Sequence, residues 1–138
     1  MIAETDIAYI AGIIDGEGHI EFARRKEKRK GNTSNCIRIN IRVQMTDQSV
    51  LLWMREVIGM GTVRKRNRSP SIKPHWKDSW VYTIRFREAY QLCLLIWPFA
   101  HVKLPKIQQI IEHYSLEKLK KDNVVNLEDY KNARQIHI

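Results

Sequence analysis

The stretch IAGIIDGEG, residues 10–18, decides how the fold of this chain is interpreted. It completes an apolar segment that predicts a helix over residues 7–15, with Asp6 as a candidate N-cap. The alanine and glycines within it suit the close approach of another helix. A helix that is apolar on every side must be buried on every side, so we expect this one to be buried all round. Glu17 then lies just past its end, beside glycines that allow a ligand to approach the backbone.

The sequence changes to a period of two after this stretch. Ile20 and Phe22 alternate with polar neighbours, which predicts a strand, and the basic, polar residues 24–35 predict its end and a turn. In residues 37–45 every second residue is apolar and the others are Arg, Asn or Gln. This alternation is typical of a half-buried antiparallel strand with a long polar face.

The rest of the chain repeats the same kinds of element. A helix follows, with Thr46 or Asp47 as its candidate N-cap, and ends at Gly59. The further elements that we expect are strands over residues 61–68 and 80–87 and helices over residues 88–97 and 105–121. In the second of these strands Trp80, Tyr82, Ile84 and Phe86 suit either a core face or a binding face. The order predicts an α+β fold, αββαββα, in which helices cover one face of a four-stranded antiparallel sheet. We expect a single domain, 1–138, with its core at about 5–121 and a C-terminal tail, 122–138.

The charge of the chain is concentrated in one segment. It has 24 Lys and Arg residues against 15 Asp and Glu, a net charge of +9 and a pI near 9.8. Between Arg24 and Lys77 there are fifteen basic residues and three acidic ones, a local charge of +12, whereas the remainder has a charge of −3. A positive charge gathered on one surface indicates a polyanionic partner, and nucleic acid is the leading class.

Other features exclude several classes of protein. Cys36 and Cys93 have no spacing typical of a zinc site or a disulfide framework. The longest apolar run, residues 92–97, is too short to cross a membrane, and Glu4 and Asp6 lie where a signal peptide would be basic. We therefore expect an intracellular protein, in the cytoplasm or an organelle, that is not secreted and has no membrane partner.

Residues 10–18 resemble the LAGLIDADG motif of homing endonucleases. The predicted order of elements, the entry of residues 59–62 into the third strand, and Pro98 followed by Lys103 are similar to members of this family with a single motif. The resemblance covers about residues 5–120. It implies the LAGLIDADG endonuclease fold, in which the four-stranded sheet forms a saddle over DNA.

The resemblance also implies a homodimer, because members with one motif pair two copies of the motif helix. The residues that it places at the dimer interface are Ile10, Ala11, Gly12, Ile14 and Asp15. Asp15 would be structural there, capping the neighbouring motif helix. Glu17 from each subunit would meet at the base of the saddle as a catalytic residue and metal ligand, together with the carbonyl of Gly16. Most members have Asp at the position of Glu17, so this chain departs from the pattern but keeps the charge.

The resemblance implies a bound metal ion and roles in catalysis for two further positions. Paired carboxylates and backbone oxygens suit Mg²⁺, or another divalent cation such as Mn²⁺, which activates water for phosphodiester hydrolysis. Lys103 matches the basic active-site residue of the family. Asp47 matches a polar position that orders water near the metal, although an N-cap role is an equal alternative and Gln44 is a competing candidate.

The polar strand faces supply the candidate DNA contacts. Arg bonds guanine, and Asn or Gln bonds adenine, in the major groove. Candidate base readers are Arg25, Arg38, Asn40, Arg42, Gln44, Arg64, Arg66 and Arg68. Basic residues in turns suit phosphate contact, and these include Lys28, Lys30, Lys73 and His75. Strands of about nine residues reach roughly 30 Å, so two subunits would span roughly twenty base pairs of double-stranded DNA.

Two functional hypotheses follow. The first is a site-specific homing endonuclease that makes double-strand breaks in a long pseudo-palindromic site by metal-dependent hydrolysis and so promotes intron mobility, with no small-molecule substrate. The second is a non-catalytic nucleic-acid binder on the same fold, either an RNA maturase or a DNA-binding regulator.

Overall fold

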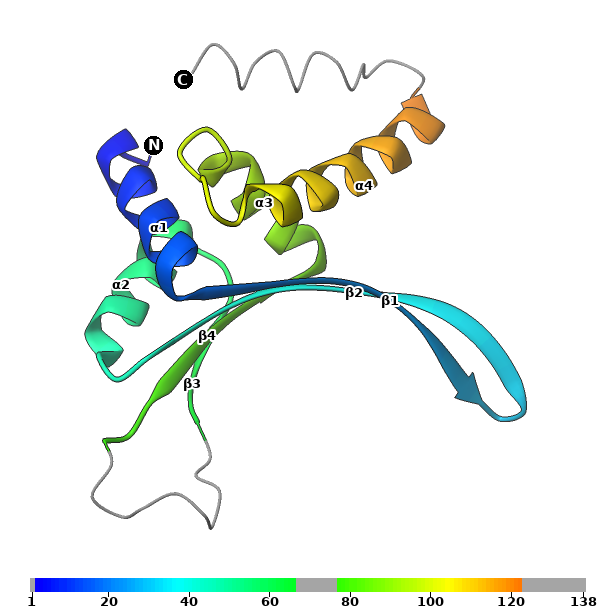
Figure 1. Ribbon diagram of the computed structural model, residues 1–138, viewed down its shortest axis with the longest axis horizontal. Helices are drawn as coiled ribbons and strands as arrows, with labels where there is room; N and C mark the ends of the chain where they lie inside the picture. The colour runs from blue at the N-terminus through cyan, green and yellow to red at the C-terminus, as the bar shows by residue number, and fades with distance from the viewer. Residues whose placement is uncertain (1, 67–76, 123–138) are drawn as a thin grey trace.

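The chain forms one antiparallel sheet with helices on a single face, as predicted (Figure 1). The computed structural model describes residues 2–66 and 77–122. Its elements, in order, are α1 (Glu4–Glu17), β1 (Gly18–Arg29), β2 (Asn32–Met45), α2 (Gln48–Ile58), β3 (Thr62–Lys65), β4 (Trp80–Arg85), α3 (Phe86–Ile96) and α4 (Leu104–Asp122). The strand order is β1-β2-β4-β3, and every neighbouring pair is antiparallel. The predicted α+β fold is therefore confirmed.

The core lies between the inner face of the sheet and the helices. Ile39, Ile41 and Val43 of β2 are at most 2% exposed, which confirms the alternation predicted for this strand. Tyr82 and Ile84 of β4 are each 1% exposed. The aromatic side of β4 is therefore the core face, and the opposite side faces outward.

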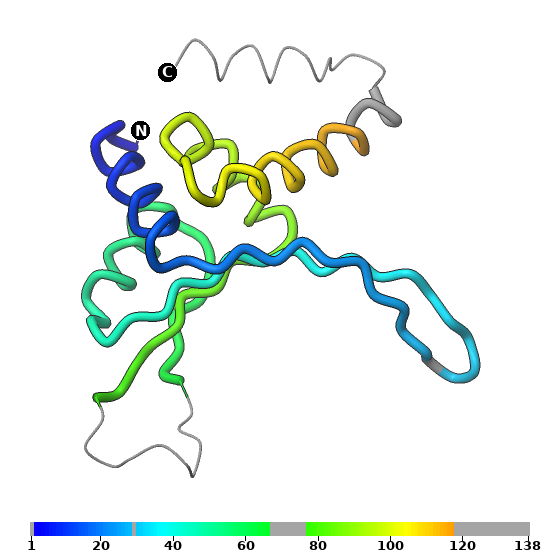
Figure 2. Tube along the Cα trace, viewed as in Figure 1, coloured from blue at the N-terminus to red at the C-terminus, as the bar shows by residue number. Residues whose placement is uncertain are grey.

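The first hairpin is longer than the sequence predicted. β1 and β2 pair in register from Gly18 opposite Val43 to Arg29 opposite Asn32. The turn consists of Lys30 and Gly31, with φ of 49° and 82°, and such paired positive values match the twist of a two-residue hairpin. Beyond the end of β4 the hairpin projects from the body as an arm, which Figure 2 shows clearly. The arm carries much of the positive charge away from the helices.

Both ends of α1 and the start of α3 differ from the prediction. α1 begins at Glu4 with Ala3 as its N-cap and no side-chain cap, so Asp6 is inside the helix. It also continues through Glu17, which is its last residue rather than lying past its end. At the other boundary Phe86 has a φ of 53°, which ends β4 and begins α3. The predicted strand 80–87 is too long because nothing local identifies a phenylalanine with positive φ.

Two glycines are required by close packing. A Cβ on Gly18 would lie 2.5 Å from the carbonyl oxygen of Ile14, so only glycine fits where α1 turns into β1. Gly61 has a φ of 89°, and a Cβ there would lie 2.6 Å from the ring of Tyr82. The Tyr82 hydroxyl donates to the carbonyl of Met60, and burial raises the pKa of this phenol. These contacts fix the entry into β1 and β3.

The described helices include none that is long and apolar enough to span a membrane. Cys36 and Cys93 are both free thiols, the first half-buried and the second buried. Burial raises the pKa of the Cys93 thiol. Arg68, Lys73 and His75, which were predicted to contact DNA, lie outside the described residues, as does most of the predicted tail.

Candidate functional site

The C-terminal end of α1 presents an exposed carboxylate at the junction with the sheet. Glu17 and Gly16 are both exposed, and the last turn of α1 contains no basic residue. The carbonyl end of a helix carries a partial negative charge, so an acid there is unfavourable unless a cation compensates it. Within the part of the chain that the structure describes, no group of three or more His, Cys, Asp or Glu forms a complete metal site. Glu17 and Gly16 therefore offer exposed oxygen atoms at this junction, but the described residues alone do not form a complete site of that kind.

Asp15 ties the start of α4 to the same end of α1. Its carboxylate accepts a hydrogen bond from the backbone N–H of His101 at 2.7 Å and another from that of Lys103 at 3.0 Å. The Lys103 carbonyl in turn accepts from the N–H of Ile107, at the first turn of α4. A carboxylate at a helix N-terminus satisfies free backbone donors and complements the helix dipole.

These contacts give Asp15 partners within its own chain and connect it to Lys103. We expected Asp15 to cap the motif helix of a neighbouring subunit, but its partners belong to its own chain, 86 and 88 residues further on. Because Asp15 lies two residues before Glu17, it holds the Lys103 backbone at the end of the helix that carries Glu17. Glu17 and the backbone of Lys103, the two main predicted catalytic residues, are therefore held at the same end of α1.

Asp47 is the N-cap of α2, the alternative role that the sequence left open. Its Oδ1 accepts from the backbone N–H of Ser49 at 3.0 Å and from the Ser49 hydroxyl at 2.5 Å. The hydrogen bond from the Ser49 side chain is the main cause that lowers the pKa of Asp47. Gln44 is placed differently: it follows Val43, the partner of Gly18 at the start of β1, and its Nε2 donates to the Ser79 hydroxyl at 3.4 Å. With Asp47 acting as the cap of α2, Gln44 stays the competing candidate for ordering water.

The predicted interface residues of α1 fall on two different faces. Ile10, Ala11 and Ile14 are each 1% exposed and pack in the core of their own chain, so they are not available to a partner. The expectation that α1 is buried all round is correspondingly wrong for a single chain. Gly12 and Gly16 face outward, and a Cβ on either would meet no atom within 4 Å. Tyr9, which is 59% exposed, lies on the same helix.

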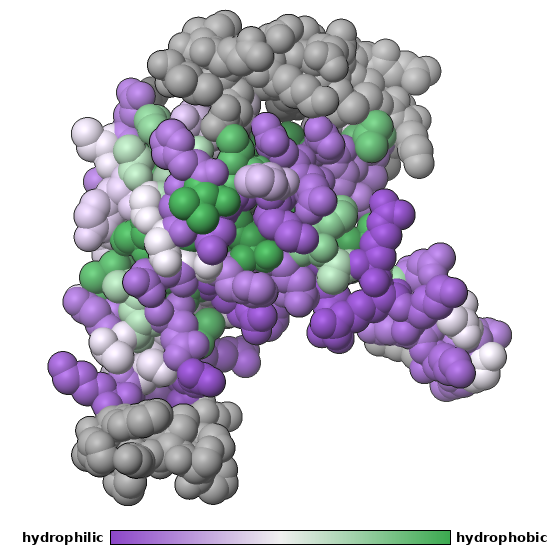
Figure 3. All heavy atoms as spheres, in the orientation of Figure 1, coloured by the Kyte–Doolittle hydropathy of each residue, from purple (hydrophilic) through white to green (hydrophobic). Residues whose placement is uncertain are grey.

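The outer face of the sheet carries the predicted polar side chains. All but one of the predicted base readers that the structure describes are exposed. The exposed ones are Arg25, Arg38, Arg42, Gln44, Arg64 and Arg66. Lys28 and Lys30 are exposed near the tip of the arm. In Figure 3 hydrophilic residues dominate the arm, in agreement with the basic composition of residues 24–30.

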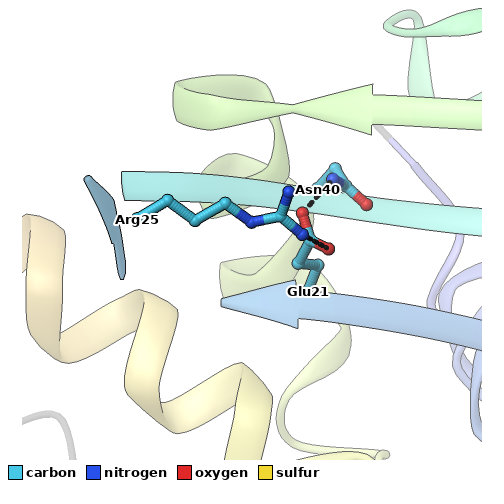
Figure 4. A network of polar contacts seen from close by, with 3 residues as sticks. All are labelled: Glu21, Arg25 and Asn40. Atoms are coloured by element: carbon cyan, nitrogen blue, oxygen red, sulfur yellow. Dashed lines mark hydrogen bonds and ion pairs between the residues drawn. The ribbon is translucent and has the colours of Figure 1, made fainter. Parts of the chain in front are cut away.

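Asn40 is the exception, because it is engaged within the protein. Its Nδ2 donates to Glu21 Oε1 at 3.2 Å, and Glu21 Oε2 lies 3.8 Å from Arg25 (Figure 4). The Oδ1 atom of Asn40 is buried and has no hydrogen-bond partner in the described structure. Reading adenine with an amide requires both of its polar atoms, so the buried oxygen removes the predicted contact in this conformation.

A cavity opens on this face where the arm leaves the body. Its volume is about 490 Å³. The lining residues, four of them arginines, are Glu21, Arg25, Arg38, Ile39, Asn40, Arg42, Thr83, Arg85 and Phe86. Glu21, Thr83 and Arg85 were missed by the sequence analysis. Choosing Tyr82 and Ile84 as the core face of β4 would have placed Thr83 and Arg85 outward by alternation, but the sequence alone left that choice open.

Comparisons with known proteins agree with this geometry. Among solved structures, the homing endonuclease I-CvuI in complex with a DNA target has a TM-score of 0.64 at 20% identity, covering 85% of this chain and 71% of that chain. The archaeal intron-encoded homing endonuclease I-Vdi141I, complexed with DNA, has a TM-score of 0.60 at 16% identity, with coverages of 79% and 66%. Meganuclease I-SmaMI, bound to DNA, has a TM-score of 0.62 at 15% identity. The match covers 94% of this chain but only 43% of the I-SmaMI chain.

At these identities the solved structures establish a shared fold. The comparison with curated proteins gives no match. The family model described as LAGLIDADG endonuclease matches residues 10–92, well over half of the chain, and begins at the first residue of the motif. The chain therefore belongs to the LAGLIDADG endonuclease family.

Proposed function

We propose that this protein is a homing endonuclease that acts as a homodimer and cuts both strands of a specific double-stranded DNA site with the help of a divalent metal ion. The observation that carries the proposal is the position of Glu17. It is an exposed carboxylate at the negative end of the motif helix, directly before the sheet whose outer face is rich in arginine. In a protein that only bound DNA, a carboxylate at this position would repel the phosphates and lower the affinity.

A second copy of the chain explains the glycines of α1. Glycine within a helix costs about 1 kcal/mol relative to alanine, and neither Gly12 nor Gly16 is needed for packing inside the chain. They are one helical turn apart, so they form a flat strip where a partner backbone fits closely. An apolar cavity of about 460 Å³, lined in part by Tyr9 and Trp53, continues this surface between α1 and α2. Two α1 helices packed through the strip would bring both Glu17 residues together.

The donor set at the end of α1 suits a hard divalent cation. Glu17 offers carboxylate oxygens and Gly16 a backbone carbonyl, and both residues are exposed. Mg²⁺ prefers oxygen ligands of this kind and is commonly held by one or two carboxylates together with substrate phosphate. When bound, such an ion supplies an activated water and stabilises the leaving oxygen. The pair of Glu17 carboxylates would hold it between the subunits.

Lys103 supplies the positive charge for the reacting phosphate. Asp15 holds its backbone, so the lysine side chain extends from a fixed point at the end of α1. Lys103 is a half-buried residue, and its ammonium would offset the charge that develops on the phosphate in the transition state. The sheet would position the DNA, and the arm, through Lys28 and Lys30, would contact phosphates outside the centre.

A plasmid cleavage assay tests the proposal. Purified protein is incubated with a plasmid that carries the uninterrupted host locus, once with Mg²⁺ and once with EDTA. We expect linear product with Mg²⁺ alone, loss of cutting in Glu17→Ala, and retained cutting in Glu17→Asp. Glu56→Ala, which removes an exposed carboxylate from α2, is the matched control and should cut normally.

The same assay separates the alternatives. Specific binding without cutting by the wild-type protein would favour a non-catalytic binder on this fold. Full cutting by Glu17→Ala would refute the role of Glu17. A stable monomer on DNA, measured by analytical ultracentrifugation, would refute the dimer.

A further inference from the structure

One carboxylate lies in the arginine-lined cavity of the outer sheet face. Glu21 shares this cavity with Arg25, Arg38, Arg42 and Arg85. A carboxylate opposes the binding of phosphates, so it weakens the general attraction of this face for DNA. A role of Glu21 in DNA binding must therefore be something other than raising the affinity.

The carboxylate is held in place and keeps a free acceptor. Asn40 Nδ2 donates to Glu21 Oε1 at 3.2 Å, while the side chain of Glu21 remains 19% exposed. Glu21 Oε2 is 3.8 Å from Arg25, beyond hydrogen-bond distance, and the Arg25 side chain is 51% exposed. An exposed ion pair of that length contributes little. Glu21 lines the cavity, and among the described residues the contact of its Oε2 is this long ion pair with Arg25, which Figure 4 draws beside the hydrogen bond from Asn40.

The register sets a donor in line with this acceptor. Glu21 pairs with Asn40, and Asn40 pairs with Arg85, so the three residues form one row across β1, β2 and β4. Neighbouring strands are about 4.8 Å apart, so the backbones of Glu21 and Arg85 are roughly 10 Å apart. Arg85 is exposed at the end of β4 and lines the same cavity as Glu21. The row thus presents the carboxylate of Glu21 as an acceptor and the guanidinium of Arg85 as a donor. Between them, the amide of Asn40 donates to Glu21.

We propose that Glu21 and Arg85 together read one C·G base pair of the bound DNA. A carboxylate only accepts hydrogen bonds, and the cytosine N4 amine is the donor of a C·G pair in the major groove. The guanidinium of Arg85 donates to O6 and N7 of the paired guanine. Asn40 is the positioning residue that keeps Glu21 in this orientation. The inference rests on the proposed DNA-binding function and adds a specificity determinant to it.

Glu21→Gln is the discriminating variant. Glutamine has nearly the same shape and keeps an oxygen to accept from Asn40, which turns its Nε2 donor toward the DNA. A donor in that place opposes cytosine N4 and suits thymine O4 or guanine O6. Glu56→Gln is the matched control, because it removes the same charge from the exposed surface of α2.

The experiment selects bound duplexes from a randomised DNA library for the wild type and each variant, and then measures dissociation constants for single base-pair changes. We expect Glu21→Gln to lose roughly 5- to 150-fold of its discrimination for C·G at one position in each half-site. Arg85→Gln should lose discrimination at the same position, with a combined effect smaller than the product of the two. Glu56→Gln should keep the wild-type preferences.

A uniform change in affinity across all sequences would show that Glu21 is only a counter-ion and would overturn the inference. Effects of Glu21→Gln and Arg85→Gln at different base pairs would overturn it as well. Neither result would touch the proposed function. A wild-type protein that selected no sequence at all would instead refute specific DNA recognition itself, and the inference with it.

Discussion

Replacing Gly12 with alanine is expected to stabilise the isolated subunit and to weaken its self-association. Gly12 lies inside α1, far enough from both ends to be fully helical, and a Cβ there meets no atom within 4 Å. The substitution therefore adds helix propensity without a clash inside the chain. The expected gain in the free energy of unfolding is about 1 kcal/mol.

In the proposed dimer the same methyl group has the opposite effect. A strip of glycines allows two helix backbones to approach closely, and a Cβ in that strip forces them apart or leaves gaps beside it. Overpacking of this kind typically costs about 1–3 kcal/mol. Each dimer contains two copies of the substitution, so the dissociation constant should rise by at least tenfold.

Two measurements separate the effects. Thermal unfolding at a concentration where the wild type is monomeric should give a melting temperature roughly 3–5 °C higher for Gly12→Ala. Analytical ultracentrifugation over a concentration series should show weaker association. Gln109→Ala, on an exposed position of α4, controls for helix propensity and should leave association unchanged. A Gly12→Ala variant that associates as tightly as the wild type would refute the assignment of this face to the dimer.

Three further outcomes are expected. Asp15→Ala loses the hydrogen bonds from the backbone N–H groups of His101 and Lys103, so it should lower the cleavage rate at least tenfold while DNA affinity stays within a few-fold. Equal losses of cleavage rate and DNA affinity would contradict a role of Asp15 in placing Lys103. Because the pKa of Asp47 is lowered in the folded state, its stabilising contribution is present above its unfolded pKa of about 3.9 and is lost as the pH falls through the folded value. Urea unfolding at pH 7 and pH 3 should therefore show a smaller pH dependence for Asp47→Ala than for the wild type, and identical dependences would count against the cap. Gly61→Ala should destabilise the fold by more than about 2 kcal/mol, because it adds a Cβ 2.6 Å from a tyrosine ring at a φ of 89°; an unchanged denaturation midpoint would show that the turn relaxes.

Local patterns were sufficient where one segment carries its own signal. The alternation of β2 identified its buried side chains, and Gly59 ends α2 in the left-handed conformation expected of a helix C-cap. Such signals fail where a residue adopts a backbone conformation that is rare for its type. Phe86 adopts a positive φ and is 51% exposed, so the end of β4 was misplaced. The two-residue turn at Lys30 and Gly31 was likewise found only as a broad polar region.

The fold class, the motif and the charge-bearing surface were determined by the sequence itself, because periodicity, glycine placement and the order of elements are local properties. Tertiary structure alone decided which face of α1 remains open, since that depends on what packs against Ile10 and Ile14. It also decided that Asp15 holds a backbone segment more than eighty residues away. The row of Glu21, Asn40 and Arg85 exists only through the register of three strands. Register and packing join segments that are remote in the chain, and no local pattern encodes those distances.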